Sequence, residues 1–581
     1  MPHATVPSPG FQAFILCGPG VSLNTFTSNP KDFPKALVPI ANRPMVWYPL
    51  EWCYRMGVTN IQLITPPESA PALEAALSQN PHLTSLPAPK PDVLAPEDLT
   101  QTTGTGEIFR LPEVQEAITG DFIVLPCDLI CELDGSELAE AWMIQEGGLG
   151  AASGGIDDDG VPIRMGIGGE KSGRRGGLGV WYETKGEGAV KGQETDFIAT
   201  TPLPASTAPT PTGSLRPDIS KLAYAMPTDT LKDISEEKKG FPIRHALLKK
   251  HGRIKMLMTH RDAHIYLFPY WVAQMMAHND KFDSLSEDVV GWWAKAGWQD
   301  GLGEKLGLRG ILQSSGNKEI NDSTNSNELD DEVDVAALST TQSKPYTNGE
   351  RTHTTKLASR AQDSSIDSLT IEPPLQIPPI LAYVQPSDPS LPFIRRVDTA
   401  TLLLSISLRL AKLPSMEDAK RDNKSPSPLA HAAKIAHPDA LPKQGRVEAE
   451  NSLLAENVQV GERATIKESV VGTGCTIGSG ALLQRCLLME GAIVGENCRL
   501  SDCILGRRCK ITGGPRMDEE KTDLRNCEVQ EGNVVPWGTD AKNEKFMVFE
   551  GLSDEEPSSD DDAQAVLDDL DGDGQMPISE R

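Results

Sequence analysis

The chain has 581 residues, 38% of them hydrophobic and 24% charged, and its formal net charge at pH 7 is −27. This length exceeds one ordinary domain and provides apolar material for more than one core. The sequence has no apolar run of about eighteen residues that could cross a membrane, and its first ten residues lack the basic and apolar regions of a signal peptide. An acidic chain is also poorly suited to direct binding of nucleic acid. We therefore expect a cytosolic protein without a membrane or nucleic-acid partner.

The first segment, from Phe11 to Leu149, alternates short apolar runs with amphipathic stretches of helical period. The strand-like runs are FQAFILCG, VTNIQLIT and GDFIVLPCDLI, and the helix-like stretches are RPMVWYPLEWCYRMG, ESAPALEAALSQ and DGSELAEAWMIQEGG. The first helix has Pro44 at its start and Gly57 at its end, which are favoured positions for both residues. Strands alternating with helices predict a parallel sheet with crossover connections. We expect a doubly wound, Rossmann-like α/β domain over residues 11–313.

The first of these helices is rich in aromatic residues. Because most aromatic side chains on an amphipathic helix lie in the core, we expect core packing, with a partial contribution to a partner contact. The set comprises Trp47, Tyr48, Trp52 and Tyr54.

Glycine, threonine and proline dominate residues 150–220, where only GVWYET and TDFIATT resemble strands, so we predict surface insertions there. Order returns with FPIRHALLKKHGRIKMLMTHRDAHIYLFPYWVAQMM, which reads as a helix, two apolar runs and a second helix, and with the helical LSEDVVGWWAKAGWQ. Residues 314–375 are rich in Ser, Thr, Asn and Asp and predict a disordered linker. A bridge segment over 376–450 follows.

A repeat marks the last folded segment. From Val460 to Ile511 aliphatic residues recur in steps of five or six, and three steps sum to seventeen. Glycine directly follows several of these positions, as a corner of the chain would need. The pattern predicts a coil of three short strands per turn, stacked about 4.8 Å apart. We expect a hexapeptide β-helix over residues 451–549. The glycines are Gly461, Gly472, Gly478, Gly495 and Gly506.

The ten cysteines form no CxxC pair, which indicates small buried side chains in a reducing compartment. Cys486 and Cys503 are seventeen residues apart, so they should stack on successive coils. Without an accompanying carboxylate or histidine, we expect packed free thiols and no metal site. After the β-helix, residues 550–581 carry twelve acidic residues and one basic residue. We expect this segment to be a solvated, disordered tail, with an acidic binding motif as the alternative.

Four motifs in order give the N-terminal half a family resemblance. ILCGPGVSL, FPKALVPIANRPM, TTGTGEIF and a strand ending in PCDL resemble the sugar nucleotidyltransferase family, which also carries a C-terminal left-handed hexapeptide β-helix. The resemblance implies that in active members the loop amides hold the nucleoside triphosphate and a loop arginine stabilises the pyrophosphate. It also implies that a lysine approaches the phosphates and that an aspartate holds magnesium. Fixed positive charge and a hard cation suit that chemistry.

This chain keeps only part of that set. Lys35 and Asp128 are present, but Ser22 stands where the family has the loop arginine, and Pro19 replaces a glycine. A neutral serine cannot replace the arginine charge. No good match exists for the second catalytic lysine. We therefore expect no catalytic residues, no enzyme activity and no cofactor, with nucleotide or Mg²⁺ binding at Asp128 as a vestige. The residues expected at this vestigial site are Gly18, Gly20, Ser22, Lys35, Gly104 and Asp128.

Among members with degenerate sites, the chain is similar to the nucleotidyltransferase-like subunits of the guanine nucleotide exchange factor for translation initiation factor 2. Only an acidic tail follows Gly551, where the epsilon type adds a helical exchange module, so the gamma type fits better. The resemblance implies a scaffold that binds the epsilon, alpha, beta and delta subunits and initiation factor 2. The alternative is an active guanylyltransferase that makes an activated sugar. An acyltransferase is a weaker alternative, because no histidine lies between Val458 and Thr512.

Overall fold

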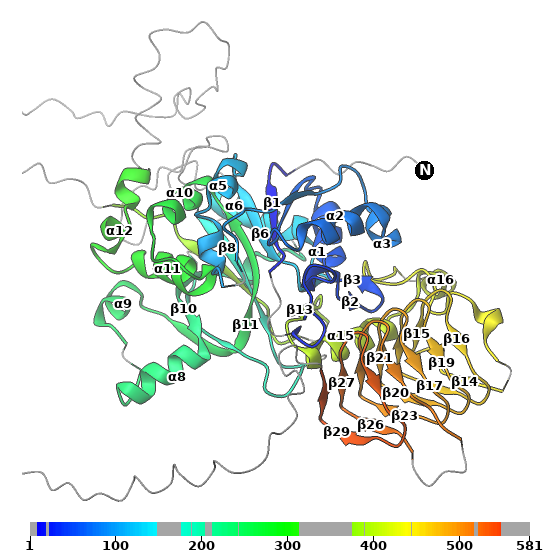
Figure 1. The fold of residues 1–581 in the computed structure, drawn as a ribbon. Helices are drawn as coiled ribbons and strands as arrows, with labels where there is room; N and C mark the ends of the chain where they lie inside the picture. Colours follow the sequence, from blue (N-terminus) through cyan, green and yellow to red (C-terminus); the bar gives the residue numbers. More distant parts are fainter. Residues whose placement is uncertain are drawn as a thin grey trace, which may run out of the picture.

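The computed structural model shows an α/β body beside a β-helix (Figure 1). The predicted linker and acidic tail, much of the predicted insertion, and Gly20 and Ser22 lie outside the residues that the structure describes. Those residues are 9–18, 23–100, 102–147, 176–186, 189–203, 212–241, 243–312, 375–388, 390–423, 425–442, 444–515 and 521–547.

A nine-stranded sheet forms the centre of the body, in the order β5-β4-β1-β6-β11-β8-β12-β10-β9. The first four strands are parallel, as predicted: β5 (Asp92–Leu94), β4 (Asn60–Ile64), β1 (Gln12–Leu16) and β6 (Phe122–Pro126). The other half, built from residues beyond the segment for which a parallel sheet was predicted, is mostly antiparallel. Its strands are β11 (Lys255–Phe268), β8 (Gly177–Glu183), β12 (Ile380–Val384), β10 (Ile219–Pro227) and β9 (Asp196–Thr201).

Two of these strands differ from the sequence interpretation. The two apolar runs expected before FPYWV form one long strand, β11, which continues through an irregularity between Asp262 and Tyr266. The bridge contributes β12 to the sheet interior, because its ILAYV sequence is apolar enough to be buried between β8 and β10. A second bridge strand, β13 (Ile394–Arg396), pairs with β7 (Leu129–Cys131). The bridge is therefore woven into the α/β body.

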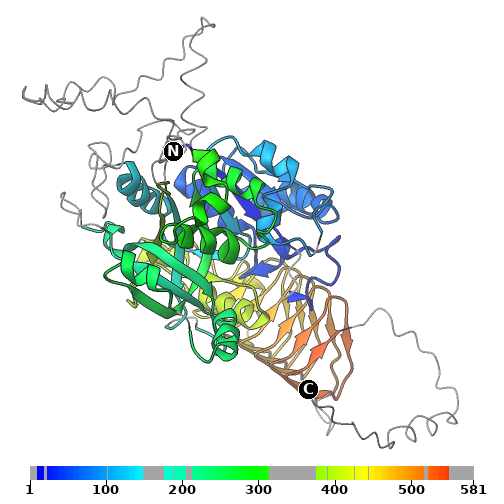
Figure 2. The ribbon, with the colours of Figure 1, turned by 90° about the vertical axis from the view of Figure 1, so that its left-hand side faces the viewer.

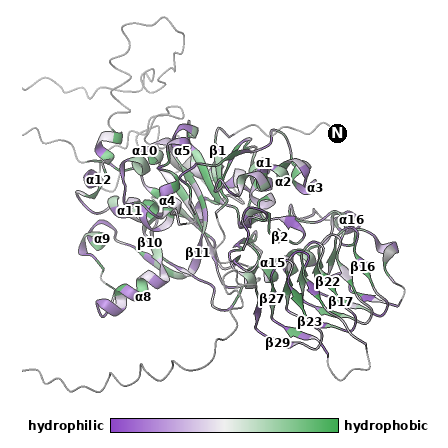
Figure 3. Cartoon of the chain, in the orientation of Figure 1, coloured by the Kyte–Doolittle hydropathy of each residue, from purple (hydrophilic) through white to green (hydrophobic). Residues whose placement is uncertain are grey.

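Helices cover both faces of the sheet. Along β1, Ala13 and Ile15 face one hydrophobic cluster, and Phe14 and Leu16 face another, so the strand is buried on both sides. Figure 3 shows this apolar centre in green and the polar surface of α8 in purple. The helices are α1 (Trp47–Met56), α2 (Ala70–Gln79), α3 (Pro81–Thr84), α4 (Thr105–Ile108), α5 (Pro112–Ala117), α6 (Gly135–Gly147), α8 (Thr228–Glu237), α9 (His245–Lys250), α10 (Tyr270–His278), α11 (Gly291–Ala296), α12 (Leu302–Lys305), α15 (Ala400–Lys412) and α16 (Met416–Arg421).

The aromatic helix α1 lies in the core. Trp47, Tyr48 and Trp52 are buried, and the Trp52 indole donates to the Leu133 carbonyl at 2.8 Å. The Arg43 guanidinium lies 4.1 Å from the centre of the Trp47 ring. The side chain of Tyr54 is half-buried and donates to the Pro89 carbonyl. Because Trp47 is only 8% exposed, it offers little surface to a partner, and its replacement would disturb the fold first.

The β-helix follows the predicted repeat. Its strands form three parallel ladders, and Val460 pairs with Ile477 and that residue with Val494, seventeen residues apart at each step. Ile511 pairs with Val535, 24 residues on, so one coil carries seven extra residues. The strands are β14 (Arg446–Val447), β15 (Leu453–Leu454), β16 (Gln459–Val460), β17 (Thr465–Lys467), β18 (Val470–Val471), β19 (Thr476–Ile477), β20 (Leu482–Gln484), β21 (Leu487–Leu488), β22 (Ile493–Val494), β23 (Arg499–Ser501), β24 (Ile504–Leu505), β25 (Lys510–Ile511), β26 (Asp523–Arg525), β27 (Glu528–Val529), β28 (Val534–Val535), β29 (Asp540–Lys542) and β30 (Lys545–Phe546).

Glycine is required at the predicted positions for a reason other than the expected corners of the chain. A Cβ atom on Gly461 or Gly478 would lie 2.5–2.6 Å from a backbone nitrogen of the next coil, so close approach excludes a side chain. The left-handed backbone occurs at other corner positions, such as Gly474, Gly480 and Asn497. The six cysteines of the β-helix are buried and free, as expected.

The β-helix packs directly on the α/β body. Thr25 donates to the Glu528 carboxylate at 2.8 Å, and the Arg507 guanidinium lies 3.8 Å from the centre of the Phe33 ring. Helix α15 shares one hydrophobic cluster with the body and with outward-facing β-helix residues such as Val470 and Leu487. Figure 2 shows α15 between the two parts. No helix in the described ranges is long and apolar enough to cross a bilayer.

Candidate functional site

Asp128 lies at the carboxyl end of β6, where the sequence analysis placed it. The preceding Cys127 N–H donates to the Leu16 carbonyl of the neighbouring strand β1, and the Asp128 carbonyl accepts from the N–H of Val397 at 2.9 Å. The Asp128 side chain is 1% exposed. A carboxylate so deeply buried requires strong partners.

Two cations satisfy this carboxylate. Lys35 Nζ lies 2.7 Å from Asp128 Oδ2, and Arg396 Nε donates to Oδ1 at 3.1 Å, while its Nη2 lies 3.4 Å from Oδ2. Burial alone would raise the pKa of Asp128, but the charges of Arg396 and Lys35 outweigh it and hold the pKa well below its ordinary value. Burial would likewise lower the pKa of Lys35, yet the Asp128 carboxylate raises it. All three groups are therefore ionised at neutral pH.

The sequence analysis missed Arg396. It lies on β13, 268 residues beyond Asp128, and reaches the site because β13 pairs with β7 immediately after Asp128. Arg396 belongs to the sequence LPFIRRVDTA of the bridge segment, and no sequence pattern links one of its arginines to a distant aspartate. Only the strand pairing reveals the contact.

The donor set at Asp128 does not fit a divalent cation. Mg²⁺ needs several oxygen ligands at about 2.1 Å, whereas both Asp128 oxygens accept hydrogen bonds from cationic side chains. Lys35 and Arg396 would also repel an incoming metal ion. Among the described residues, no group of three or more His, Cys, Asp or Glu side chains is placed to hold a metal. The vestigial magnesium site remains a hypothesis that this geometry disfavours.

Of the four expected site residues that the structure describes, Lys35 and Asp128 are in direct contact. Gly18 follows β1 and is half-buried with open space where a Cβ would lie. Gly104 precedes α4 and packs so closely on Asp283 that a Cβ would lie 2.2 Å from that carbonyl oxygen. No hydrogen bond or ion pair of the described chain joins Gly104 to Lys35 or Asp128. Its glycine is explained by packing. The positions of Gly20 and Ser22 are outside the described residues.

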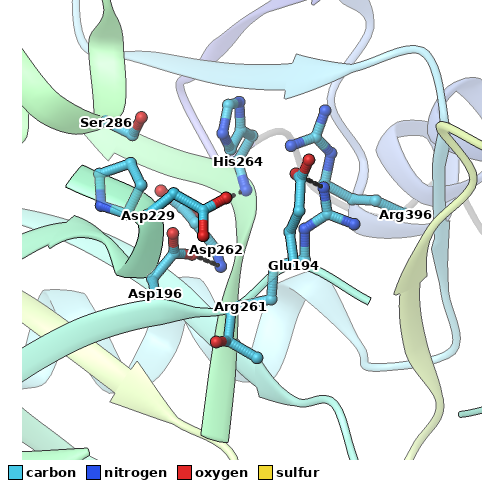
Figure 4. Close-up of a pocket in the computed structure, with 10 residues that line it drawn as sticks. Glu194, Asp196, Asp229, Arg261, Asp262, His264, Ser286 and Arg396 are labelled. Atoms are coloured by element: carbon cyan, nitrogen blue, oxygen red, sulfur yellow. Dashed lines mark hydrogen bonds and ion pairs between the residues drawn. The ribbon is translucent and has the colours of Figure 1, made fainter. Parts of the chain in front are cut away.

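A small polar cavity of about 110 Å³ adjoins the ion pair, and Arg396 lines it (Figure 4). Opposite Arg396 lie Asp196 and Asp262, from neighbouring strands β9 and β11. Asp196 Oδ2 accepts from the Asp262 N–H at 2.6 Å. Arg261, also at the cavity, pairs with Asp398 at 2.5 Å. Sequence reasoning missed this cavity, since its lining residues are spread over five separate segments.

Asp262 is the most perturbed acid of this cavity. Burial and the nearby charge of Asp196 raise its pKa to about 7. The Tyr266 hydroxyl donates to Asp262 Oδ2, and the His264 N–H donates to Oδ1 at 2.8 Å. Burial and the charge of Arg396 lower the pKa of His264, so its imidazole is neutral. The cavity thus holds an acid that changes charge near neutral pH.

Two matches to known proteins agree with this architecture. The family model described as the GMPPB C-terminal domain matches residues 448–537, within the β-helix. The chain is 24% identical over 309 residues to a Schizosaccharomyces pombe protein named translation initiation factor eIF2B subunit gamma. That alignment covers 53% of this chain and 56% of the relative, so the chain spans about half the length of the curated relative it matches. The predicted resemblance is confirmed: both matches fit a nucleotidyltransferase-like protein with a C-terminal hexapeptide-repeat domain.

Proposed function

We propose that the chain is a non-catalytic subunit of the guanine nucleotide exchange factor for translation initiation factor 2. It would bind the epsilon subunit and, with it, the alpha, beta and delta subunits and initiation factor 2 in the cytosol. The similarity to a protein named as the gamma subunit of eIF2B supports the assignment to this complex. The pairing of Arg396 and Lys35 with Asp128 carries the proposal that its own site is not catalytic.

The ion pairs around Asp128 support a non-catalytic role. Nucleotidyl transfer needs positive charge where the pyrophosphate leaves and a metal ion on the aspartate. In this chain, the buried cations neutralise the aspartate within the protein. Arg396 and Lys35 are held by Asp128 and are not placed as free charges for a phosphate. The arrangement supports a role in stabilising the α/β body.

A scaffold must hold its parts in fixed relation, and the contacts between body and β-helix support this role. One hydrophobic cluster runs from the sheet through α15 to the β-helix. Thr25 and Ser28, which follow the glycine-rich turn, bind Glu528 and Gln530 of the last coils. The glycine-rich turn therefore leads directly into a segment fixed on the β-helix, and the lateral β-helix surface is presented at a defined angle to the body.

Native mass spectrometry of the complex tests the assignment. The tagged chain would be purified from its own cells at moderate salt and the intact assembly weighed. We expect stoichiometric co-purification with the alpha, beta, delta and epsilon subunits. A homo-oligomer free of these proteins would contradict the proposal.

The second candidate is an active sugar-1-phosphate guanylyltransferase, favoured by Lys35, Asp128 and the match to the GMPPB C-terminal domain. Pyrophosphate release from GTP and mannose 1-phosphate would test it. We expect the wild type and the Ser22→Arg variant to release no more pyrophosphate than the Asp128→Asn variant. The added arginine would leave Asp128 paired with Arg396. Release by the wild type that Asp128→Asn abolishes would establish the enzyme and refute the non-catalytic role.

A further inference from the structure

A basic surface with exposed apolar side chains covers α9 and the start of β11. Ile243, Leu248, Met256 and Met258 are 45%, 53%, 39% and 49% exposed. Residues 238–260 contain seven Lys or Arg and no Asp or Glu, in a chain whose net charge is −27. We call the exposed side chains of residues 243–258 the basic apolar patch. Exposed apolar side chains grouped in this way mark an interaction site.

The patch rests on a rigid base. The buried side chain of Leu247 packs against Ala223 and Trp298, with Ile254 beside them. Arg244 donates to Gln299 at 2.7 Å, which fastens the start of α9 to the end of the helical layer. The exposed methionines are adaptable in shape and suit contact with an aliphatic surface.

Several cations of the patch lack an acidic partner. Lys249, Lys250 and Arg253 make no ion pair within the part of the chain that the structure describes. Lys255 lies near enough to Asp218 to lower the pKa of that acid, which burial raises. The surface therefore combines uncompensated positive charge with exposed apolar area. An acidic segment that also carries aliphatic side chains would complement it.

The sequence supplies such a segment in its own tail. Ala563, Val566, Leu567 and Leu570 have the i, i+3, i+4, i+7 spacing of one helix face. Seven aspartates lie among or beside them, between residues 560 and 573. Composition alone predicts a solvated tail, and the basic apolar patch is a surface of complementary chemistry for it. A helix formed on binding would place its aliphatic side chains together and its carboxylates outside them.

We propose that residues 560–573 bind the basic apolar patch of the same chain. The aliphatic stripe would cover Leu248, Met256 and Met258, and the aspartates would lie opposite the lysines and Arg253. Covering this surface would withhold it from acidic segments of other proteins. The proposal concerns a regulatory contact of the chain itself and does not depend on membership of the exchange factor.

The tail is tethered to the end of the β-helix. Twelve residues separate Met547, the last described residue, from Asp560, and an extended chain of that length spans about 40 Å. A short tether gives an effective concentration of about 1 mM, so an intrinsic affinity of about 0.1 mM would keep the patch roughly 90% covered.

Hydrogen exchange of the full chain, followed by mass spectrometry at low salt, tests the contact. The variant V566S/L567S/L570S removes the aliphatic stripe and keeps every acid. At the stated affinity, exchange of residues 245–258 should become about 10-fold faster than in the wild type. The control M576S/I578S removes two apolar tail residues outside the stripe and should leave exchange unchanged. In the patch variant K249E/R253E, the tail should no longer slow the exchange of residues 245–258.

Three results would overturn the proposal. The first is equal exchange in the wild type and the stripe variant. The second is equal acceleration in the control variant, which would show that the aliphatic stripe has no special part. The third is protection that rises when the protein concentration is increased about 10-fold, which would assign the contact to a second copy. The stripe variant and the control variant both remove apolar residues of the tail, so the control accounts for any general effect of such substitutions.

Discussion

The site around Asp128 and the β-helix fill their buried space by opposite means. In the β-helix, each coil repeats the aliphatic contacts of the coil before it, as in the column Val460, Ile477 and Val494. At Asp128, one buried carboxylate depends on two cations from distant parts of the chain. Repetition spreads stability over many equivalent contacts, whereas the ion-pair cluster concentrates it in a few side chains.

This contrast predicts different responses to substitution. Removing one partner of a buried ion pair leaves an uncompensated buried charge. This lowers the free energy of unfolding by more than the intact pair adds relative to apolar residues of similar size. Removing one aliphatic side chain from a regular stack leaves a cavity whose cost depends on how far the neighbours relax. Removing an exposed charge from a coil corner should cost least, because water solvates what remains.

Asp128→Ala should have the largest effect. It leaves the buried Lys35 and Arg396 charges without their carboxylate, and breaking a buried pair in this way costs about 3–5 kcal/mol. We expect the urea midpoint of the α/β body, followed by tryptophan fluorescence, to fall sharply. Lys232→Ala, which removes an exposed ion pair on α8, is the control and should leave the midpoint unchanged. An unchanged midpoint for Asp128→Ala would show that the cations have other partners.

The same contrast explains what the sequence could predict. The β-helix was predictable from Val460 to Ile511 because its contacts recur there every seventeen residues, whereas the coil with seven extra residues departs from the period. The parallel half of the sheet was predictable because its strands and helices alternate along the chain. The contact of Arg396 with Asp128 was not, since it depends on the pairing of β13 with β7. The insertion of β12 between β8 and β10 joins segments separated by the long linker, and no local pattern records it.

Leu500→Ala tests the β-helix side of the comparison. Leu500 is fully buried and pairs with Leu483 on one side and Leu524 on the other. Truncation of a buried leucine costs about 2–5 kcal/mol, depending on how far the surrounding stack relaxes into the cavity. The loss should appear in a β-helix transition followed by far-ultraviolet circular dichroism. Leu482→Ala truncates the half-buried neighbour on the outer face, and its free energy of unfolding should fall clearly less. Equal losses would mean that the stack relaxes around the cavity.

Asp262→Asn should change the pH dependence of the α/β body. The folded pKa of Asp262 is about 7, above its ordinary value, so the folded state keeps a proton that the unfolded state releases near pH 4. Stability from this group is therefore present at low pH and lost as the pH rises towards 7. One pKa unit corresponds to about 1.4 kcal/mol, so we expect the wild type to lose at least that amount between about pH 5 and pH 8 relative to the variant.

Urea midpoints of both proteins at the two pH values provide the measurement. The window lies above the pH at which Asp128 begins to lose its charge, because that group has a depressed pKa and destabilises the fold only as the pH falls below about 4. Its contribution is therefore constant across the comparison. Parallel curves for the wild type and Asp262→Asn would show that Asp262 is already ionised in the folded protein.

The smallest effect is expected for Asp502→Asn on the β-helix. Asp502 pairs with Arg485 of the preceding coil at 2.7 Å, but the side chains are 42% and 51% exposed. Such pairs contribute about 0–1 kcal/mol and are screened by salt. Asparagine also tolerates the left-handed backbone at this corner, where φ is 56°, so the substitution removes charge without adding strain. The midpoint shift should be below about 1 kcal/mol and should vanish at about 1 M NaCl, where the screening length is near 3 Å. A larger, salt-independent loss would mean that the coil corners, like the Asp128 site, depend on individual ion pairs, and the contrast between the two regions would no longer hold.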